Sequence, residues 1–370
     1  MRVLHLCAGN LYGGVERIVA ECAAARMLCP AMTPSVAVCF EGRLAQEIDA
    51  LGLHCTRLGA ARMSRPHTVL RARRQLGRLL EAERPLTVIC HSSWIFGLAA
   101  PVVRAAGETL VLWVHDPPSA RTWADRWARL TSPDLIIANS RFTDQSVRAF
   151  YRGTPHAVLY APVADAAVSG ERADARAALG VDEQTPVILI ASRFEAWKGH
   201  RELIAAAARV SEPWRMWIAG RPQRAGEDAY EGELRDCAAA SGVADRVQFL
   251  GERRDVPALM RAADVHCQPN TAPEPFGLAF VEALYAGLPV VTTATGGALE
   301  IVTDDCGVLL PPGDAGALER ALRALVVDRK ARARLGSAGP ARARELCDPA
   351  RQLAALAAML TSAATRQVTA

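Results

Sequence analysis

Short apolar runs alternate with segments of helical periodicity along most of the chain. In the first half the apolar runs are Arg2–Cys7, Ser35–Phe40, Leu53–Leu58, Leu86–Cys90, Thr109–Val114 and Leu135–Ala138. The helical segments between them include Val15–Leu28, Arg43–Leu51 and His67–Glu83. Short apolar runs predict buried strands, and their alternation with helices predicts a parallel sheet covered by helices on both faces.

The alternation stops once, at Ala161–Asp174, and then begins again. This stretch is small, polar and proline-containing, so we interpret it as a linker. Further strands are predicted at Val187–Ser192, Arg215–Ala219, Val247–Leu250, Asp264–Gln268, Val290–Ala294 and Val308–Leu310. A chain of 370 residues is long for one core. The sequence therefore predicts an α/β protein of two doubly wound, Rossmann-like parallel-sheet domains, 1–165 and 166–346, facing a cleft.

Charge is unevenly distributed along the chain, whose net charge is +4. Residues 1–165 hold 19 arginines and 13 acidic residues, a balance that permits an anionic partner without requiring one. Lysine occurs only at Lys198 and Lys330. A lysine in a chain that otherwise uses arginine suggests a role that a guanidinium cannot fill.

Composition and motifs argue against several classes of protein. With 51% hydrophobic residues the chain is too apolar to be disordered, and no uncharged apolar run is long enough to cross a membrane. The ten cysteines form no C-x-x-C pair and no secretory signal is visible, so we expect a cytoplasmic protein with reduced core cysteines. No D-x-D, zinc spacing, Walker loop or G-x-S-x-G occurs, so neither a metal site nor a cofactor is predicted.

The stretch Pro269–Gly297 concentrates the features of a ligand site. A proline-flanked loop carries Glu274, and Gly277 then frees the backbone at the start of an apolar helix whose single charge is Glu282. A lone carboxylate on an apolar helix is costly unless donors meet it, and a helix N-terminus favours an anion. We therefore predict a ligand with an anionic middle and hydroxyl-bearing ends.

The spacing of the two carboxylates suggests what that ligand is. Eight residues of helix would separate Glu274 from Glu282 by about 12 Å, roughly the length of a diphosphate with a sugar on each side. Each carboxylate could accept hydrogen bonds from one pair of hydroxyls, while the amides of Gly277 and Leu278 meet a phosphate. The alternative is a solvent-facing loop carboxylate and an incidental buried one paired with an arginine.

Other loops at the predicted carboxyl ends of strands carry cations and glycines. Arg193 and Lys198 could neutralise a diphosphate, or they could form ordinary surface charge at a helix start. Gly220 ends another predicted strand. Gly13 and Gly14 precede a helix, so their amides could face a phosphate, although a tight strand–helix turn explains them equally well.

Histidines and arginines add weaker signals. His115 follows a strand, where it could hydrogen-bond a reacting sugar or serve as a structural histidine, and His91 poses the same choice. One predicted helix is dense in arginine, which could contact anionic lipid headgroups or form a solvated face. Its arginines are Arg71, Arg73, Arg74 and Arg78.

These motifs resemble the retaining glycosyltransferases of the GT-B fold, family 4, the "glycosyl transferases group 1". The pair Glu274 and Glu282, followed by Gly-x-Pro-Val-Val and Gly-Gly, matches the E-x7-E element of that family, and Ser192–Gly199 matches a second signature. The resemblance covers essentially the whole chain and extends to a terminal helix, within 347–370, that crosses back to the first domain. The segment Tyr160–Asp165 departs from the Asn-Gly-Val-Asp motif that is usual in the family.

The resemblance implies a role for each charged residue of the second domain. Arg193 and Lys198 would hold the diphosphate of a donor. Glu282 would bind the nucleotide ribose, and Glu274 would bind the hydroxyls of the transferred sugar.

It also implies roles for backbone groups and for the first domain. The backbone of Phe276, Gly277 and Leu278 would meet sugar and phosphate. His115 would stand near the reacting sugar, and Gly14 would approach the β-phosphate.

The activity implied by the resemblance is retaining, metal-independent transfer of a hexose from a nucleotide-diphosphate sugar to a hydroxyl acceptor, with UDP favoured over GDP. The donor is a co-substrate, and no nucleic acid is involved. Domain 1–165 would bind a glycan, lipid-linked or small-molecule acceptor, and domain 166–346 the donor. Synthesis of bacterial envelope polysaccharide or lipopolysaccharide is the common setting, with membrane association on the cytoplasmic face. Alternatives are a nucleotide-sugar epimerase, a glycoside phosphorylase and a non-catalytic sugar-nucleotide sensor.

Overall fold

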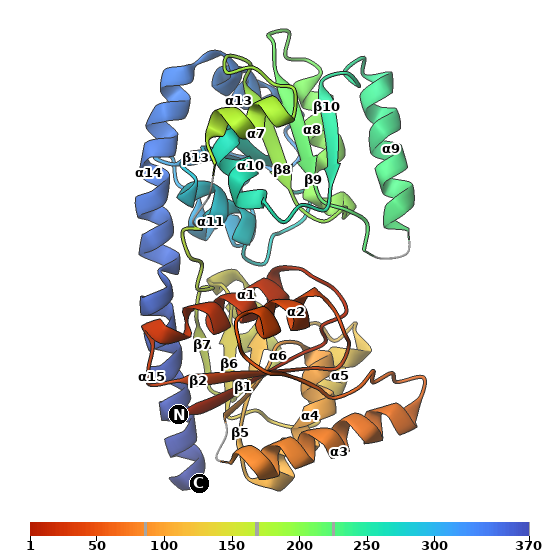
Figure 1. Cartoon of the computed structure of the whole chain (residues 1–370), viewed down its shortest axis with the longest axis vertical. Helices are drawn as coiled ribbons and strands as arrows, with labels where there is room; N and C mark the ends of the chain where they lie inside the picture. Colours follow the sequence, from red (N-terminus) through yellow and green to blue (C-terminus); the bar gives the residue numbers. More distant parts are fainter. Residues whose placement is uncertain (85–86, 167–169, 224–225, 370) are drawn as a thin grey trace. The chain divides into compact units, whose positions relative to one another are not determined.

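The computed structural model describes residues 1–84, 87–166, 170–223 and 226–369, which form two compact units (Figure 1). The first unit consists of Met1–Ala164 and Cys347–Ala370, and the second consists of Asp165–Leu346. Each unit has its own parallel sheet and its own buried apolar core. Each is therefore an α/β domain with an independent hydrophobic interior.

The sheet of the first unit has seven parallel strands in the order β3-β2-β1-β4-β5-β6-β7. The strands are β1 Arg2–Cys7, β2 Thr33–Val38, β3 Cys55–Arg57, β4 Thr87–Cys90, β5 Thr109–Val114, β6 Leu135–Ala138 and β7 His156–Val158. Every residue of β4, β5 and β6 is buried, as expected for central strands covered on both faces. The strand order reverses direction between β1 and β4, which is where open α/β sheets bind ligands.

Helices cover both faces of this sheet. They are α1 Gly14–Ala24, α2 Arg43–Ala50, α3 Pro66–Glu83, α4 Ser93–Ala106, α5 Trp123–Ala128, α6 Arg141–Phe150 and the terminal α15 Pro349–Thr369. On one face, Val19 of α1 and Ile48 of α2 pack with Val38 of β2. On the other, Leu76 of α3 and Phe96 of α4 belong to a larger core. Successive side chains of each strand point to opposite faces of the sheet, so the strands contribute to an apolar layer on each face.

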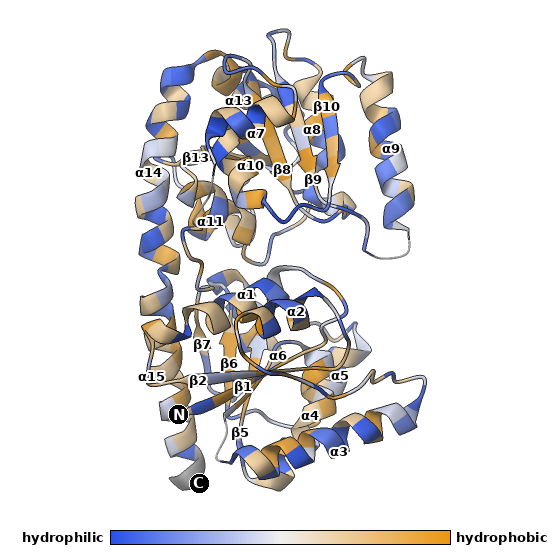
Figure 2. Ribbon diagram, viewed as in Figure 1, coloured by the Kyte–Doolittle hydropathy of each residue, from blue (hydrophilic) through white to orange (hydrophobic). Residues whose placement is uncertain are grey.

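The sheet of the second unit has six parallel strands in the order β10-β9-β8-β11-β12-β13. The strands are β8 Val187–Ala191, β9 Arg215–Ala219, β10 Val247–Gly251, β11 Val265–Gln268, β12 Val290–Thr293 and β13 Gly307–Leu310. The helices are α7 Arg172–Ala178, α8 His200–Ala207, α9 Glu227–Ala240, α10 Val256–Ala262, α11 Leu278–Tyr285, α12 Ala298–Ile301, α13 Ala315–Val327 and α14 Arg329–Cys347. The strands are mostly hydrophobic, whereas α9 carries broad hydrophilic stretches (Figure 2).

The predicted fold class is confirmed, since both halves are doubly wound parallel sheets. Several elements escaped prediction, among them the short helices α5 and α12, the strand β7 and the helix α7. The edge strand β7 has only three residues, and helix α7 begins at Arg172, inside the stretch interpreted as a linker. Residues 167–169 of that stretch, and Leu86 at the start of a predicted strand, lie outside the described residues.

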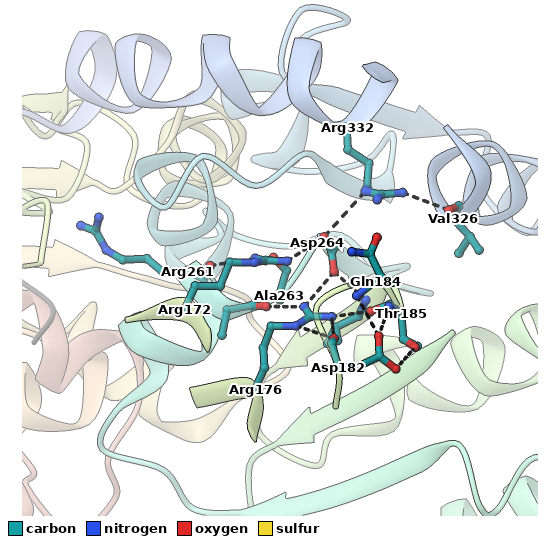
Figure 3. Close-up of polar contacts among 12 residues, drawn as sticks. Arg172, Arg176, Asp182, Gln184, Thr185, Arg261, Ala263, Asp264, Val326 and Arg332 are labelled. Carbon is teal, nitrogen blue, oxygen red and sulfur yellow. Dashed lines mark hydrogen bonds and ion pairs between the residues drawn. The ribbon is translucent and has the colours of Figure 1, made fainter. Parts of the chain in front are cut away.

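A network around Asp264 fixes the amino-terminal ends of β8 and β11 (Figure 3). One carboxylate oxygen of Asp264 accepts a hydrogen bond from the Val187 amide at 2.8 Å, and the other accepts one from Arg172 at 2.8 Å. Arg176 donates to the same carboxylate at 3.1 Å. Asp264 therefore ties the first residue of β8 and the residue before β11 to helix α7.

Arg176 is the most buried cation of this network. Only 1% of its side chain is exposed. Besides Asp264, it donates to the backbone carbonyls of Ala262 at 2.8 Å and Asp182 at 2.7 Å, and to that of Thr185. A guanidinium removed from water needs such a full set of acceptors. The polar helix α7 is consequently held in place by buried polar contacts rather than by an apolar face.

We predict that Arg176→Met lowers the free energy of unfolding by about 3–5 kcal/mol, because it leaves buried carbonyls without a donor. Denaturant titration measures the change. Arg320→Met is the matched control, because the Arg320–Asp314 pair is exposed and its charged atoms lie 3.9 Å apart. The control should change the free energy by less than about 1 kcal/mol. Equal effects of the two substitutions would contradict the importance of the buried network.

Candidate functional site

The loops after four strands of the second unit carry most of the predicted site residues. Arg193 and Lys198 follow β8, Gly220 follows β9, Glu274 follows β11, and Gly296 follows β12. All of these strands are parallel, so their carboxyl ends lie at one edge of the sheet. Loops at this edge form the ligand sites of open α/β folds.

Lys198 and Glu274 form an ion pair at this edge. The ammonium Nζ of Lys198 lies 2.7 Å from Oε2 of Glu274, and their side chains are 13% and 10% exposed. The same oxygen accepts hydrogen bonds from Nε2 of Gln268 at 3.0 Å and Nδ2 of Asn270 at 3.3 Å. The Lys198 ammonium also lies 3.9 Å from the centre of the Trp197 ring. The site is therefore a largely desolvated carboxylate with a cation and two amides converging on one oxygen.

The backbone of Glu274 is held by the two glycines after β12. Glu274 forms a parallel bridge with Gly296, and the Gly297 amide donates to the Glu274 carbonyl at 2.7 Å. Gly296 has a φ of +64°, and a Cβ there would lie 2.2 Å from the Glu274 carbonyl oxygen. Only glycine permits this approach. The Gly-Gly pair thus sets the position of the carboxylate.

Helix α11 begins directly after the Glu274 loop. Gly277 takes a left-handed conformation with φ +109°, and a Cβ there would lie 2.4 Å from the Phe280 ring. Phe276 is buried and Leu278 is the first helical residue. The expected glycine start of this helix is confirmed. The amides of its first turn point out of the helix end, where they favour an anion.

Two expectations about the carboxylates are wrong. Glu274 lies before the helix, which begins at Leu278, so the 12 Å spacing of an eight-residue helical rise does not apply. Glu282, which was expected to be buried, is only half-buried, whereas the loop residue Glu274 is buried at 7% exposure. The reason is tertiary, since the loop is drawn inward by the partners of its carboxylate.

Arg193 and Gly220 frame the same edge. Arg193 pairs with Glu195 at 3.0 Å and keeps 29% of its side chain exposed. Gly220 is extended at φ +158°, and a Cβ on it would lie 2.0 Å from the Ser192 carbonyl oxygen. Its amide donates to the Gly251 carbonyl at 2.9 Å. Gly220 therefore lets the β9 loop touch the backbone that leads to Arg193.

In the first unit, Gly13 and Gly14 stand at the start of α1, as expected. The Gly13 amide, however, donates to the Glu16 carboxylate at 3.0 Å. This is the reciprocal half of a capping box, which satisfies an amide at the helix start. In this structure the Gly13 amide is therefore engaged by Glu16, and its contact with a phosphate stays a prediction. Gly14 is exposed and remains accessible.

His115 follows β5 and is buried. It is the third member of a hydrogen-bonded row of buried histidines that begins with His5 and His91. Nε2 of His115 is 3.0 Å from Nδ1 of His91, and Nε2 of His91 is 2.9 Å from Nδ1 of His5. The carbonyl of His115 accepts a hydrogen bond from Asn139 at 2.9 Å. Burial lowers the pKa of His5 to about 4 and that of His115 to about 3. The pKa of His91 is lowered by burial first, and then by its two histidine neighbours.

The arginines of α3 do not act as one surface. Arg71, Arg74 and Arg78 are exposed. Arg73 instead donates to the carbonyls of Leu98 at 2.9 Å and Gly97 at 3.2 Å, both within α4. Its inclusion in a lipid-contacting set is therefore wrong, because its guanidinium is committed to another helix.

Sequence reasoning missed Gln268, Asn270 and His5. Gln268 and Asn270 were signalled by two amide residues at the end of a buried strand, a place where polar side chains usually serve a site. No local signal marked His5, which lies inside an apolar strand. Among the described residues, no group of three or more His, Cys, Asp or Glu is placed to hold a metal ion. None of the described helices is both long and apolar enough to cross a membrane.

Two protein families match the chain in tandem. The family described as Glycosyltransferase Family 4 matches residues 12–164, and the family Glycosyl transferases group 1 matches residues 171–342. The boundary between the two matches falls between the structural units. Glu274, Glu282, Arg193 and Lys198 all lie in the second match.

Curated relatives and solved structures agree with these matches. A D-inositol 3-phosphate glycosyltransferase of Mycobacterium sp. (strain KMS) is 34% identical over 189 residues, which are 50% of this chain and 42% of the relative. The lipopolysaccharide core mannosyltransferase LpsB of Rhizobium meliloti is 32% identical, over 46% of this chain and 50% of its own. The chain spans about half the length of the curated relatives it matches. HepE of Anabaena, solved with UDP-glucose, is 25% identical, with a TM-score of 0.85 over 98% of this chain and 100% of its own.

The low pKa values of His5, His91 and His115 predict that the free energy of unfolding falls on acidification. Their pKa values are about 6.5 when unfolded and lower when folded, so the unfolded chain binds more protons between about pH 6.5 and pH 4. The contribution of each neutral histidine to the free energy of unfolding is therefore fully present above pH 6.5. It is lost as pH falls through this window, by roughly 2 kcal/mol per histidine at pH 5. Urea titrations at several pH values measure the slope. His5→Asn should reduce it by up to one proton, and an unchanged slope would contradict the assignment.

Gly296→Ala is predicted to destabilise the chain more than Gly313→Ala. Both glycines have positive φ, but a Cβ at Gly313 meets nothing within 4 Å, whereas one at Gly296 meets the Glu274 backbone. Gly313→Ala thus measures backbone strain alone, about 1–2 kcal/mol. The excess for Gly296→Ala reports the contact that holds Glu274. Equal losses in thermal or chemical unfolding would show that the contact does not constrain the loop.

Proposed function

The chain belongs to family 4 of the glycosyltransferases, the glycosyl transferases group 1, and we propose that it transfers a hexose from a nucleotide-diphosphate sugar to a hydroxyl acceptor with retention of configuration. The observation that carries the proposal is the Lys198–Glu274 pair at the carboxyl edge of the second sheet. It combines a cation suited to a diphosphate with a carboxylate suited to sugar hydroxyls. The second unit is the proposed donor-binding domain.

Each residue at this edge has a proposed part in holding the donor. Lys198 and Arg193 meet the diphosphate, since an ammonium carries three N–H donors and Lys198 uses one of them for Glu274. Glu274 accepts hydrogen bonds from the hydroxyls of the sugar, and Glu282 accepts them from the ribose. The first turn of α11 meets a phosphate through the Gly277 and Leu278 amides.

Four further residues have proposed parts in the site. Phe276 contributes backbone contacts to the sugar, and Gly220 brings the β9 loop close to Arg193. His115 of the first unit stands near the reacting sugar, and Gly14 approaches the β-phosphate.

The proposed chemistry needs no metal ion. The bond between the sugar C1 and the diphosphate oxygen breaks, and the acceptor oxygen bonds C1 on the same face. The acceptor proton passes to the departing phosphate oxygen, which leaves as the nucleoside diphosphate. Lys198 and Arg193 stabilise the charge that develops on the leaving group, an electrostatic contribution of the kind that is usually largest.

We favour UDP as the nucleotide and a cell-envelope glycan or lipid as the acceptor. HepE is solved with UDP and with UDP-glucose, and LpsB is named for lipopolysaccharide core synthesis. Another relative, from Corynebacterium glutamicum, is named as GDP-mannose-dependent and is 33% identical over 183 residues. Experiment must therefore decide whether the donor carries UDP or GDP. Residues 1–164 are the proposed acceptor-binding domain, acting on the cytoplasmic side.

A thermal-shift panel with UDP, GDP, ADP and their sugars tests donor binding. A donor at 100 times its dissociation constant should stabilise the folded protein by about 2.7 kcal/mol, which raises its melting temperature. We expect the largest shift with UDP and a UDP-hexose. Product analysis then separates transfer from epimerisation or phosphorolysis. Absence of a shift with every nucleotide would overturn the proposed function.

Lys198→Ala and Glu282→Ala are each expected to abolish transfer and to leave the fold intact. Lys198→Ala removes the cation that stabilises the leaving group, and Glu282→Ala removes the ribose acceptor. Lys330→Ala is the matched control, since Lys330 is the other lysine and is exposed at the start of α14. Turnover assays with the preferred donor measure the effect. Near-normal turnover in either site variant would contradict the site assignment.

A further inference from the structure

Three histidines from neighbouring strands form a continuous hydrogen-bonded row across the first sheet. His5 lies in β1, His91 follows β4, and His115 follows β5, and these strands are adjacent in the order β1-β4-β5. The two N···N distances are 2.9 and 3.0 Å. The ring planes of each bonded pair are nearly parallel, at 23° and 14°, and the centroids lie 5.1 and 5.3 Å apart, as expected for imidazoles joined edge to edge. Trp113 packs on both His91 and His115 and fixes their ring planes.

The row determines which nitrogen His115 can offer to another molecule. Its Nε2 is taken by His91, so Nδ1 remains. Among the described residues, Nδ1 of His115 is buried without a hydrogen-bond partner. A buried polar atom of this kind is costly unless something binds it, and it is therefore a place to expect a ligand contact.

The other end of the row reaches a small cavity. His5 uses Nδ1 for His91, which leaves Nε2 for its remaining contacts. His5 lines a cavity of about 10 Å³ together with Cys22, Cys29 and Leu353. That volume holds about one water molecule, which can either donate a hydrogen bond to a histidine nitrogen or accept one from it. His5 is therefore compatible with either tautomer.

Each hydrogen bond of the row needs one proton, and this couples the three tautomers. A neutral imidazole carries a single N–H. If His91 donates from Nδ1 to His115, His115 carries its proton on Nδ1, and His5 must donate from Nδ1 to His91. If His91 donates from Nε2 to His5, all three carry the proton on Nε2. In a neutral row the same nitrogen is therefore protonated in all three rings.

We propose that His91 and His5 are positioning residues for His115, holding its ring by Nε2 and setting whether Nδ1 donates or accepts a hydrogen bond toward the substrate. The inference rests on the proposed function, which places His115 near the reacting sugar. A row with His115 protonated on Nδ1 donates to a sugar oxygen. A row with His115 protonated on Nε2 presents the lone pair of Nδ1 to a hydroxyl group of the substrate. The lowered pKa values keep the rings neutral at pH 7, which the coupling requires.

Nitrogen NMR of protein labelled with ¹⁵N-histidine tests the coupling without any substrate. The ¹⁵N shifts of each ring distinguish a protonated Nδ1 from a protonated Nε2, and single substitutions assign the three rings among the eight histidines. We expect the same nitrogen to be protonated in His5, His91 and His115. In His91→Phe, which removes both hydrogen bonds, His115 should change its tautomer or become a mixture. Different tautomers within the wild-type row, or an unchanged His115 in the variant, would overturn the proposal.

Kinetics separate positioning from simple structural support. His91→Phe should lower kcat on the order of tenfold or more and leave the KM for the donor within a few-fold. His91→Asn places a polar atom near the position of Nδ1 and should restore part of kcat. His54→Phe, an exposed histidine of the same unit, is the control. If His91→Phe turned over like the control, the positioning role would be excluded. If no donor supports transfer by the wild type, the proposed function fails. The NMR result then decides by itself whether the tautomers of the three histidines are coupled.

Discussion

A carboxylate that is removed from water must be met by donors, and this constraint organises the loops of the second unit. Glu274 is 7% exposed, and its donors come from different places along the chain. Lys198 arrives from the loop after β8, whereas Gln268 and Asn270 arrive from the end of β11. The glycines after β12 hold its backbone. Moving any of these loops would leave a buried charge with fewer partners, so the ion pair and the glycine contact together hold the loops after β8, β11 and β12 to one another.

Strands β8 and β11 are consequently restrained at both ends by buried charge. At their amino-terminal ends Asp264 binds the Val187 amide and Arg176. At their carboxyl ends Lys198 and Glu274 close the loops. The two ion pairs have different surroundings, because Arg176 is saturated by protein acceptors, whereas Lys198 keeps donors for other partners. The first arrangement supports the fold, and the second is suited to a ligand.

The sequence was sufficient for the architecture because strands buried on both faces leave continuous apolar runs. It failed where tertiary contacts replace local signals. Helix α7 has no apolar face and is held by Arg176, and β7 is too short to stand out. The motif predicted Lys198 and Glu274 as parts of one site, but the 12 Å estimate between Glu274 and Glu282 assumed continuous helix, whereas α11 begins only at Leu278. His5 was beyond reach, because it meets His91 across 86 residues of chain and only the strand order brings them together.

The near-absence of lysine gives the chain an unusual chemical handle. Lys198 has a largely covered ammonium, whereas Lys330 is exposed on α14. An amine-directed dye would therefore attach at Lys330 and at the chain's amino group. Fluorophores or surface linkers could be installed this way without touching the residues around Glu274. The extent of reaction at Lys198 would in turn report how tightly the loops around it are closed.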